Sequence, residues 1–210
     1  MRNVTDRTSN PFGMRPSCEQ FVPGYGDANA DFHVVGDHPG RHGGVDSGVP
    51  FTGESGFRLQ RALVDGGLLR SVGTEPGMRR TFFSYLHMCL PDGEGDPSES
   101  SYGDMERFFD AELRAIAAHV LLPVGERATR YVLENYTARA HKTTVDMETL
   151  HAMELRGSGF LVVPIRDPSE WDDSDHEKLV DALQTLRSTD FRREADLGRF
   201  LAGDDPYFVR

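Results

Sequence analysis

Lysine is nearly absent from this 210-residue chain, and cysteine is scarce. Of its 23 basic side chains only Lys142 and Lys178 are lysines, and its two cysteines are Cys18 and Cys89. Two thiolates cannot complete a four-cysteine zinc or iron–sulfur site on their own. The cysteines could pair, but an intracellular chain of this size rarely relies on a disulfide, so we expect two structural, reduced thiols.

The chain also lacks long hydrophobic runs. No stretch approaches the roughly 20 apolar residues of a membrane span, and residues 1–7 lack the apolar core of a secretory signal peptide. We therefore expect a cytoplasmic protein with no membrane partner. With 38% hydrophobic residues the chain can bury a sizeable core, and its length fits one domain.

The net charge of −11 is the third unusual feature. A surface that binds DNA phosphates is normally basic, so this charge argues against a nucleic-acid partner at ordinary salt. In a salt-rich cytoplasm an acidic protein could still bind DNA, because concentrated ions screen the repulsion between its charge and the phosphates. The alternative is an ordinary acidic protein that never meets DNA. The shortage of lysine favours the first interpretation, a halophilic origin.

The order of apolar segments predicts a single α/β domain over residues 31–210, preceded by an irregular arm over 1–30 that is rich in glycine, proline, asparagine and aspartate. Buried strands are expected at 31–35, 82–90, 120–125 and 160–165. This alternation of strands and helices predicts a three-layer α/β/α sandwich with a mostly parallel central sheet.

Amphipathic helices are expected between these strands. They begin near Phe57, Met105 and Glu126, and a last helix begins near Ser174, which forms a capping box with Glu177. The polar residues 92–103 are expected to form a flexible excursion.

Ligands of parallel sheets bind beyond the carboxyl ends of the strands, which directs attention to the loops at Gly36, Cys89 and Arg166. The first loop, Gly36–Gly53, reads GDHPGRHGGVDSGVPFTG and holds six glycines. Glycine lets a ligand approach the backbone closely. The loop lacks both the Gly-Lys-Ser/Thr of a P-loop and the G-x-G-x-x-G of a dinucleotide site.

Two stretches of this loop resemble the first motif of the uracil-DNA glycosylase superfamily. Residues 36–40 (Gly-Asp-His-Pro-Gly) and 48–53 (Gly-Val-Pro-Phe-Thr-Gly) are similar to Gly-Glu-Ala-Pro-Gly and Gly-Arg-Pro-Phe-Val-Gly of its bacterial and archaeal iron–sulfur branch. The likeness continues through residues 21–27 and 89–91 to Asp-Pro-Ser at 167–169, and so spans roughly residues 18–187. Together with the composition, it points to a halophilic archaeon.

The resemblance implies an enzyme that flips a damaged base out of DNA and hydrolyses its N-glycosidic bond. Cleavage builds positive charge on the sugar and negative charge on the base. Asp37 stands at the family's acidic position, where it is expected to stabilise the sugar cation or position water, and Phe51 is expected to stack on the base. Further substrate-binding residues implied by the two motifs are Gly36, Pro39, Gly40, Pro168 and Ser169.

Two substitutions separate this sequence from the family. Asp167 replaces the histidine of the closing His-Pro-Ser motif, and an ionised carboxylate only accepts hydrogen bonds, so it would repel the base anion unless protonated. His38, where the branch has alanine, is our candidate for the missing donor. Tyr85 takes the place of the asparagine that reads the uracil edge, which leaves the excised base open.

We expect no cofactor, although the resembling branch carries an iron–sulfur cluster. Cys18 and Cys89 match two of the four cluster ligands, whereas Phe21 and Phe108 or Phe109 stand at the other two positions. Apolar side chains at these positions suggest that packing has taken over the structural role of the cluster.

Two alternative functions remain open. A catalytically silent family member that binds nucleic acid or a nucleotide would explain both substitutions. A metal-dependent hydrolase would use carboxylate and imidazole ligands of one loop, namely Asp37, His38, His42 and Asp46. For the glycosylase, the expected partner is DNA with a damaged base, bound at high salt by a monomer.

Overall fold

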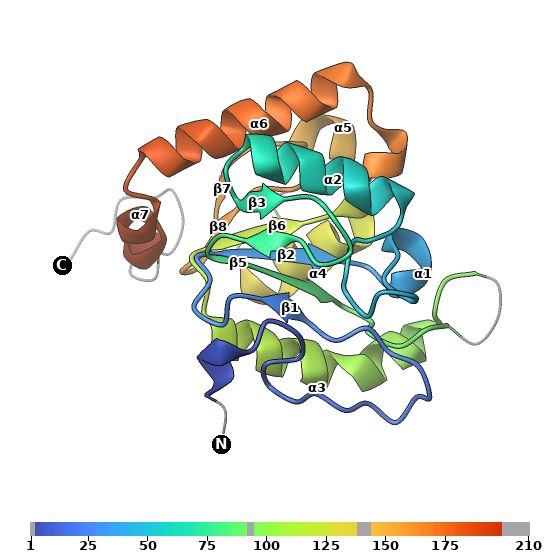
Figure 1. Ribbon diagram of the computed structural model, residues 1–210. Helices are drawn as coiled ribbons and strands as arrows, with labels where there is room; N and C mark the ends of the chain where they lie inside the picture. The colour runs from blue at the N-terminus through green and yellow to red at the C-terminus, as the bar shows by residue number, and fades with distance from the viewer. Residues whose placement is uncertain (1–2, 92–94, 138–143, 199–210) are drawn as a thin grey trace.

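A computed structural model of the chain describes residues 3–91, 95–137 and 144–198, with side chains described as far as residue 195. Within these residues the main sheet has six strands in the order β1-β5-β2-β6-β8-β7 (Figure 1). The inner strands run parallel: β5 (Thr81–Tyr85), β2 (Phe32–Gly36), β6 (Val120–Pro123) and β8 (Leu161–Val162). The edge strands run antiparallel to their neighbours: β1 (Tyr25–Gly26) and β7 (Leu155–Arg156).

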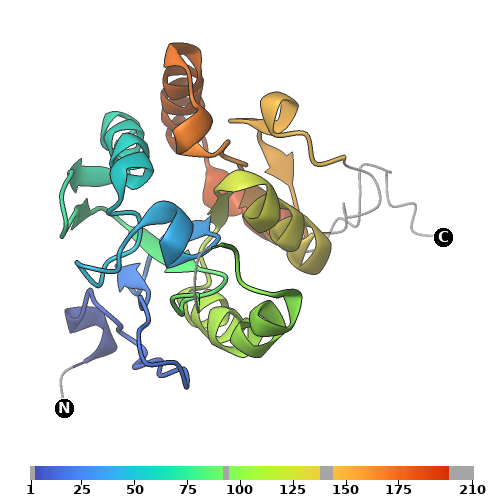
Figure 2. The same cartoon turned by 90° about the vertical axis from the view of Figure 1, so that its right-hand side faces the viewer.

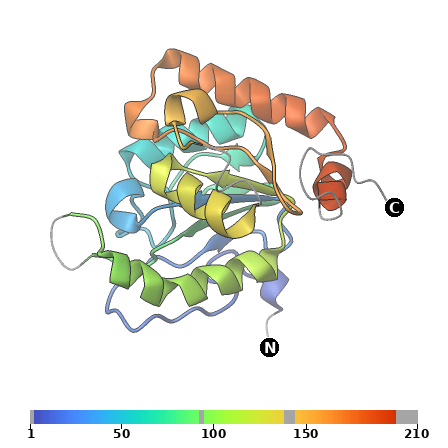
Figure 3. The same ribbon diagram turned by 180° about the vertical axis from the view of Figure 1, so that it is seen from behind.

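Helices cover both faces of the sheet and complete the predicted three-layer α/β/α fold (Figures 1 and 3). One face carries α2 (Glu54–Asp65) and α6 (Asp173–Ser188), and the other carries α3 (Glu99–Ile116) and α4 (Gly125–Tyr136). The remaining elements are short: η1 (Val4–Asp6), α1 (Pro39–His42), β3 (Leu69–Ser71), β4 (Gly77–Met78), α5 (Met147–Leu150), η2 (Pro168–Glu170) and α7 (Phe191–Gly198). Across the described ranges, every helix is too short or too polar to cross a membrane.

Successive residues of the inner strands pack against opposite helical layers. Val34 belongs to the core cluster that includes Leu63 of α2. The next residue, Val35, belongs to the cluster that includes Phe109 of α3 and Val132 of α4. Burial on both faces explains why the strands are continuous apolar runs, as is typical of parallel sheets.

Two local predictions differ from the structure. The stretch 92–103, expected to be an excursion, contains the first turn of α3, and its residues 92–94 lie outside the described part of the chain. The capping box of α6 is formed by Asp172 and Asp175 and not by Ser174 and Glu177. Aspartate caps a helix as well as serine does, so a run of both residues leaves the start of the helix ambiguous.

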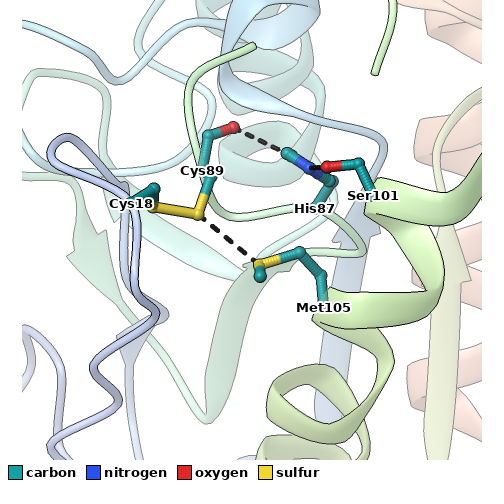
Figure 4. Close-up of a disulfide and its surroundings, with 5 residues drawn as sticks. All are labelled: Cys18, His87, Cys89, Ser101 and Met105. Atoms are coloured by element: carbon teal, nitrogen blue, oxygen red, sulfur yellow. Dashed lines mark hydrogen bonds between the residues drawn. A yellow bond between two sulfur atoms is a disulfide. The ribbon is translucent and has the colours of Figure 1, made fainter. Parts of the chain in front are cut away.

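Cys18 and Cys89 form a disulfide, so the prediction of reduced thiols is wrong (Figure 4). The fold brings the two together because Phe21, close to Cys18, forms a β-bridge with Cys89. Phe21 and Phe108 pack with both cysteines in one small apolar cluster. The prediction was wrong because it rested on the rarity of disulfides in intracellular proteins, and the sequence alone does not reveal that Cys18 and Cys89 lie close together in the fold.

The segment that carries Cys89 is also tied to helix α3 (Figure 4). His87 Nδ1 lies 2.9 Å from the Cys89 carbonyl oxygen, and His87 Nε2 lies 2.7 Å from Ser101 Oγ. The Cys89 sulfur lies 3.5 Å from the sulfur of Met105. The disulfide, β5 and the start of α3 therefore form one connected unit.

A buried aspartate at the amino end of β2 ties the last described helix to the sheet. The side chain of Asp31 is 4% exposed and accepts hydrogen bonds from the guanidinium groups of Arg80 and Arg192. Burial alone would raise the pKa of Asp31, but these hydrogen bonds outweigh it and lower the pKa to about 2. Arg192 lies in α7, so this ion pair connects α7 to the sheet.

We expect Arg192→Ala to lower the free energy of unfolding by about 1 to 2 kcal/mol, because hydrogen bonds to a charged group contribute about 1.5 to 3 kcal/mol and water screens an exposed guanidinium. Arg193→Ala is the matched control, since Arg193 is exposed and its backbone N–H, which alanine keeps, donates to Oδ1 of Asp190. The control is expected to stay within about 0.5 kcal/mol of wild type. Urea titration measures both, and equal losses would contradict the prediction.

Candidate active site

The loops that follow β2, β5 and β8 meet at the carboxyl end of the sheet, which faces the viewer in Figure 2 with α1 in the foreground. The backbone N–H of His87, after β5, donates to the carbonyl oxygen of Asp37, after β2, over 3.0 Å. Nε of Arg41, in α1, lies 2.7 Å from Oδ2 of Asp167, after β8. The predicted convergence of the three motif loops is confirmed.

Asp37 directly follows β2 and is 3% exposed. Its Oδ1 accepts a hydrogen bond from the hydroxyl of Tyr102 in α3, and its Oδ2 lies 3.9 Å from Nε of Arg127 in α4. Burial and the bond to Asp37 raise the pKa of Tyr102, so the phenol remains a donor at neutral pH. The carboxylate is thus fixed from two helices that lie far from it in sequence.

A cavity of about 500 Å³ opens beside this carboxylate. Its lining includes Asp37, Asp96 and three arginines, Arg41, Arg127 and Arg130. This volume lies in the range of sites for small ligands. The sequence predicted Asp37 at this site but missed the three arginines, because nothing in their local sequence distinguishes them from surface residues.

Phe51, Tyr85 and His42 form a buried aromatic stack next to the first motif. Phe51 lies 5.2 Å from Tyr85 and 5.4 Å from His42, measured between ring centroids. Gly36 is needed for this packing, since a Cβ at that position would lie 2.6 Å from Cζ of Phe51. Phe51 is 0% exposed, so its stacking on a flipped base stays a prediction.

The Tyr85 hydroxyl holds the backbone of the motif loop. It accepts a hydrogen bond from the Phe51 N–H over 2.7 Å and donates to the Gly43 carbonyl oxygen over 2.8 Å. Phe51 has a φ of 60°, a left-handed conformation that an aromatic residue adopts only where its surroundings enforce it. Gln60 adds a bond to the Phe51 carbonyl oxygen over 2.8 Å. Tyr85 therefore contacts the loop backbone, and its role in binding the substrate stays a prediction.

We expect Tyr85→Phe to lower the free energy of unfolding by about 1 to 3 kcal/mol, because it leaves the buried N–H of Phe51 and the partly buried carbonyl oxygen of Gly43 without their partner. Tyr25→Phe is the control, since the hydroxyl of Tyr25 donates a longer bond, 3.3 Å, to the Pro76 carbonyl oxygen and otherwise contacts the side chain of Thr8, not a backbone N–H of the motif loop. Its expected loss is below about 1 kcal/mol. Chemical denaturation compares the two, and a neutral Tyr85→Phe would show that the loop is held by packing alone.

His38 and its neighbours in the first motif lie at the start of α1. His38 is 3% exposed, and its Nε2 lies 3.1 Å from Oδ1 of Asp96. Pro39 begins α1 and is buried, whereas Gly40 is exposed. A Cβ at Gly40 would lie 3.1 Å from the His38 ring, so glycine leaves room for that ring. His38 thus pairs with Asp96 in this structure.

Asp167 is a carboxylate held by three donors. Its Oδ1 accepts hydrogen bonds from Ser169 N over 3.0 Å and Ser169 Oγ over 2.7 Å, and its Oδ2 accepts one from Arg41 Nε. Burial would raise the pKa of Asp167, but the bonds from Ser169 and Arg41 outweigh it and lower the pKa. Ser169 itself is exposed, and Arg58 fixes the buried Pro168 by donating to its carbonyl oxygen over 2.8 Å.

The residues weighed for a metal-dependent hydrolase do not form a ligand set. Asp46 is exposed, His38 pairs with Asp96, and His42 is buried in the aromatic stack. Burial lowers the pKa of His42 to about 4. The side chains described within residues 3–91, 95–137 and 144–195 include no group of three or more histidine, cysteine or acidic residues that could hold a metal ion.

Comparisons with known proteins agree with this architecture. The family model of the uracil DNA glycosylase superfamily matches residues 23–187. The type-4 uracil-DNA glycosylase of Saccharolobus solfataricus is 24% identical over 148 residues, which is 70% of this chain and 65% of that protein. The type-5 uracil-DNA glycosylase of Pyrobaculum aerophilum is 34% identical over 119 residues, 54% of this chain and 52% of that protein.

A second type-4 uracil-DNA glycosylase, from Archaeoglobus fulgidus, is 24% identical over 149 residues, 71% of this chain and 70% of that protein. The chain thus spans about half to two thirds of the length of the first two relatives. The family model covers most of the chain and includes all three motif loops. This chain belongs to the uracil-DNA glycosylase superfamily.

Proposed function

We propose that this protein is a DNA glycosylase that hydrolyses the N-glycosidic bond of uracil or another damaged base. The observation that carries this proposal is the position of Asp37, a buried carboxylate fixed by Tyr102 and Arg127 at the wall of the cavity. Relatives named type-4 and type-5 uracil-DNA glycosylases support the substrate class.

The geometry of Asp37 suits the charge that develops during cleavage. As the bond between sugar and base breaks, positive charge grows on the sugar, and a carboxylate opposite it stabilises that charge or positions the attacking water. Because Asp37 is already held in place, it does not reorient as the reaction proceeds, which is the condition under which fixed charges lower a barrier most. The target nucleotide has to leave the base stack to reach such a cavity.

The direct test is excision from labelled oligonucleotides that carry one uracil, in single- and double-stranded form, at high potassium chloride. Alkali then cleaves the strand at abasic sites. We expect cleavage of the uracil strand and none of a matched thymine strand. Failure to cleave uracil, hypoxanthine and other deaminated bases would refute the proposal. Binding of these strands without cleavage would identify the silent alternative, which the replacement of the motif histidine by Asp167 favours.

We further propose that the protein acts at high salt, as a monomer, in the cytoplasm. The net charge of −11 and the shortage of lysine support the first part. We expect the melting temperature to rise by several degrees as potassium chloride increases from about 0.1 M to about 1 M, where the screening length falls from about 10 Å to about 3 Å.

The control for this salt effect is the same measurement near the isoelectric point. Near pH 5.1, where the net charge vanishes, the same salt series is expected to change the melting temperature little. A melting temperature that stays flat or falls with salt at neutral pH would contradict the halophilic interpretation.

A further inference from the structure

We propose that Arg41 stabilises the negative charge on the departing base and that Asp167 positions it for this role. This inference rests on the glycosylase function proposed above. In the resembling family the histidine of the closing motif donates to the base anion. Here the corresponding residue is Asp167, whose pKa is lowered by its bonds to Ser169 and Arg41. An ionised carboxylate carries no proton to donate, so the donor has to come from elsewhere.

Arg41 brings a permanent cation to the side chain that replaced the histidine. Its Nε lies 2.7 Å from Oδ2 of Asp167, whose side chain is 5% exposed. Burial alone would lower the pKa of Arg41, but the hydrogen bond and the charge of Asp167 outweigh it and raise the pKa. The bond to Asp167 uses the Nε–H, and the two terminal nitrogens carry four further N–H donors. The ion pair also neutralises the charge by which Asp167 would repel a base anion.

Arg41 and Asp37 lie on the wall of the same cavity. The transition state needs a negative group beside the sugar and a positive or donating group beside the base. Asp37, directly after β2, supplies the first, and Arg41, in the following helix α1, supplies the second. The cavity therefore offers both signs of charge that the reaction requires.

The neighbouring candidates have other partners. His38 Nε2 pairs with Asp96, and burial keeps His42 neutral by lowering its pKa to about 4. The other two cavity arginines pair with glutamates of α3 and α4: Arg127 with Glu99 and Arg130 with Glu126. Arg41 is thus the cavity arginine bound to the residue that stands at the motif histidine.

The test compares two leaving groups. The anion of 5-fluorouracil is intrinsically more stable than that of uracil, so its departure depends less on a stabilising donor. We expect Arg41→Gln to lower kcat for uracil about 100-fold or more, with KM changed little, and to lower kcat for 5-fluorouracil by only about tenfold. Arg41→Lys, which keeps the charge but loses the planar guanidinium, is expected to recover part of the loss.

The positioning role of Asp167 has its own comparison. Asp167→Asn keeps an oxygen acceptor for Arg41 and is expected to retain more of kcat than Asp167→Ala, with the uracil substrate more affected than the 5-fluorouracil substrate. If Asp167 had a merely structural role, its variants would lower kcat by the same factor for both substrates. Thermal melts of each variant establish that the protein is folded.

Arg130→Gln is the matched control, because Arg130 lines the same cavity without contacting Asp167. We expect Arg130→Gln to change kcat by the same factor for the uracil and the 5-fluorouracil substrates. An Arg41→Gln variant that also changes both substrates equally, mainly in KM and with a weaker salt dependence, would identify Arg41 as a phosphate contact and overturn the inference. If wild type excises bases and a folded Arg41→Gln variant keeps the wild-type kcat, the inference about Arg41 is overturned but the proposed function is not. Wild type that excises neither of these two bases, nor hypoxanthine or another deaminated base, would overturn the proposed function as well.

Discussion

Asp37→Ala is expected to lower kcat on a uracil-containing oligonucleotide about 100-fold or more while changing KM little. The reason is that Asp37 faces charge that exists only as the glycosidic bond breaks, so its loss affects the transition state more than the bound substrate. The carboxylate is also buried and fixed by Tyr102 and Arg127, so water cannot easily replace it.

Asp46→Ala is the matched control for this variant. Asp46 belongs to the same glycine-containing loop but is exposed, so its removal changes the charge of the loop without touching the carboxylate beside the cavity. Steady-state kinetics at high salt measures both variants, and Asp37→Asn keeps a hydrogen-bond acceptor for Tyr102 should the alanine variant unfold. Equal kcat values for wild type and a folded Asp37→Ala would place the reaction elsewhere.

Glu112→Gln is expected to gain stability relative to wild type as pH rises, by about 4 kcal/mol between pH 4.5 and pH 8. Glu112 lies in α3, is 0% exposed, and points at Gly24, where a Cβ would lie 2.5 Å from its Oε1. Neither carboxyl oxygen has a hydrogen-bond partner of normal geometry among the described residues. Burial raises the pKa of Glu112 to about 8, and the nearby backbone of Gly24 lowers it only in part.

The direction of this effect follows from the proton that the folded state keeps. The usual pKa of an exposed glutamate is 4.5. Between this value and about 8, the folded protein holds a proton that the unfolded chain has released, so stability falls as pH rises, by about 1.4 kcal/mol per pH unit. The contribution is fully present below the unfolded pKa and is lost as pH rises through the folded pKa. Glutamine carries no such proton, so the advantage of Glu112→Gln grows over this range.

Denaturant titrations of the two proteins between pH 5 and pH 8 measure this divergence. Glu106→Gln is the control, because Glu106 is an exposed glutamate of the same helix. It is expected to leave the pH dependence of stability unchanged, within about 0.5 kcal/mol. A difference between Glu112→Gln and wild type that is constant across this pH range would show that Glu112 is not buried in its protonated form.

The layers of the fold and the loops of the site could be predicted from the sequence because both depend on local patterns. The apolar run that ends at Gly36 is buried on both faces, and its glycine-containing loop begins directly at the strand end. Because parallel strands end at one edge of a sheet, placing each strand also places the loop after it. This rule placed the loop that carries Asp37 at the edge of the sheet, and the resemblance of the first motif to the family singled out Asp37 within that loop.

The partners of these residues could not be predicted in the same way. Tyr102 contacts Asp37 across 65 residues, and Arg41 contacts Asp167 across 126. Such pairs depend on how helices are placed over the sheet, which no local periodicity encodes. Tyr102 was hidden further because the polar residues before it predicted an excursion where the structure has the start of α3.

The disulfide changes the connectivity of the chain. Residues 18–89 form a closed covalent ring that contains β1, β2, β5 and the whole motif loop. A protease cut inside that loop would open the ring but leave both fragments joined through Cys18 and Cys89. The strands on either side of the cut could therefore stay paired in the sheet, and the fragments would separate only after reduction as well as cleavage.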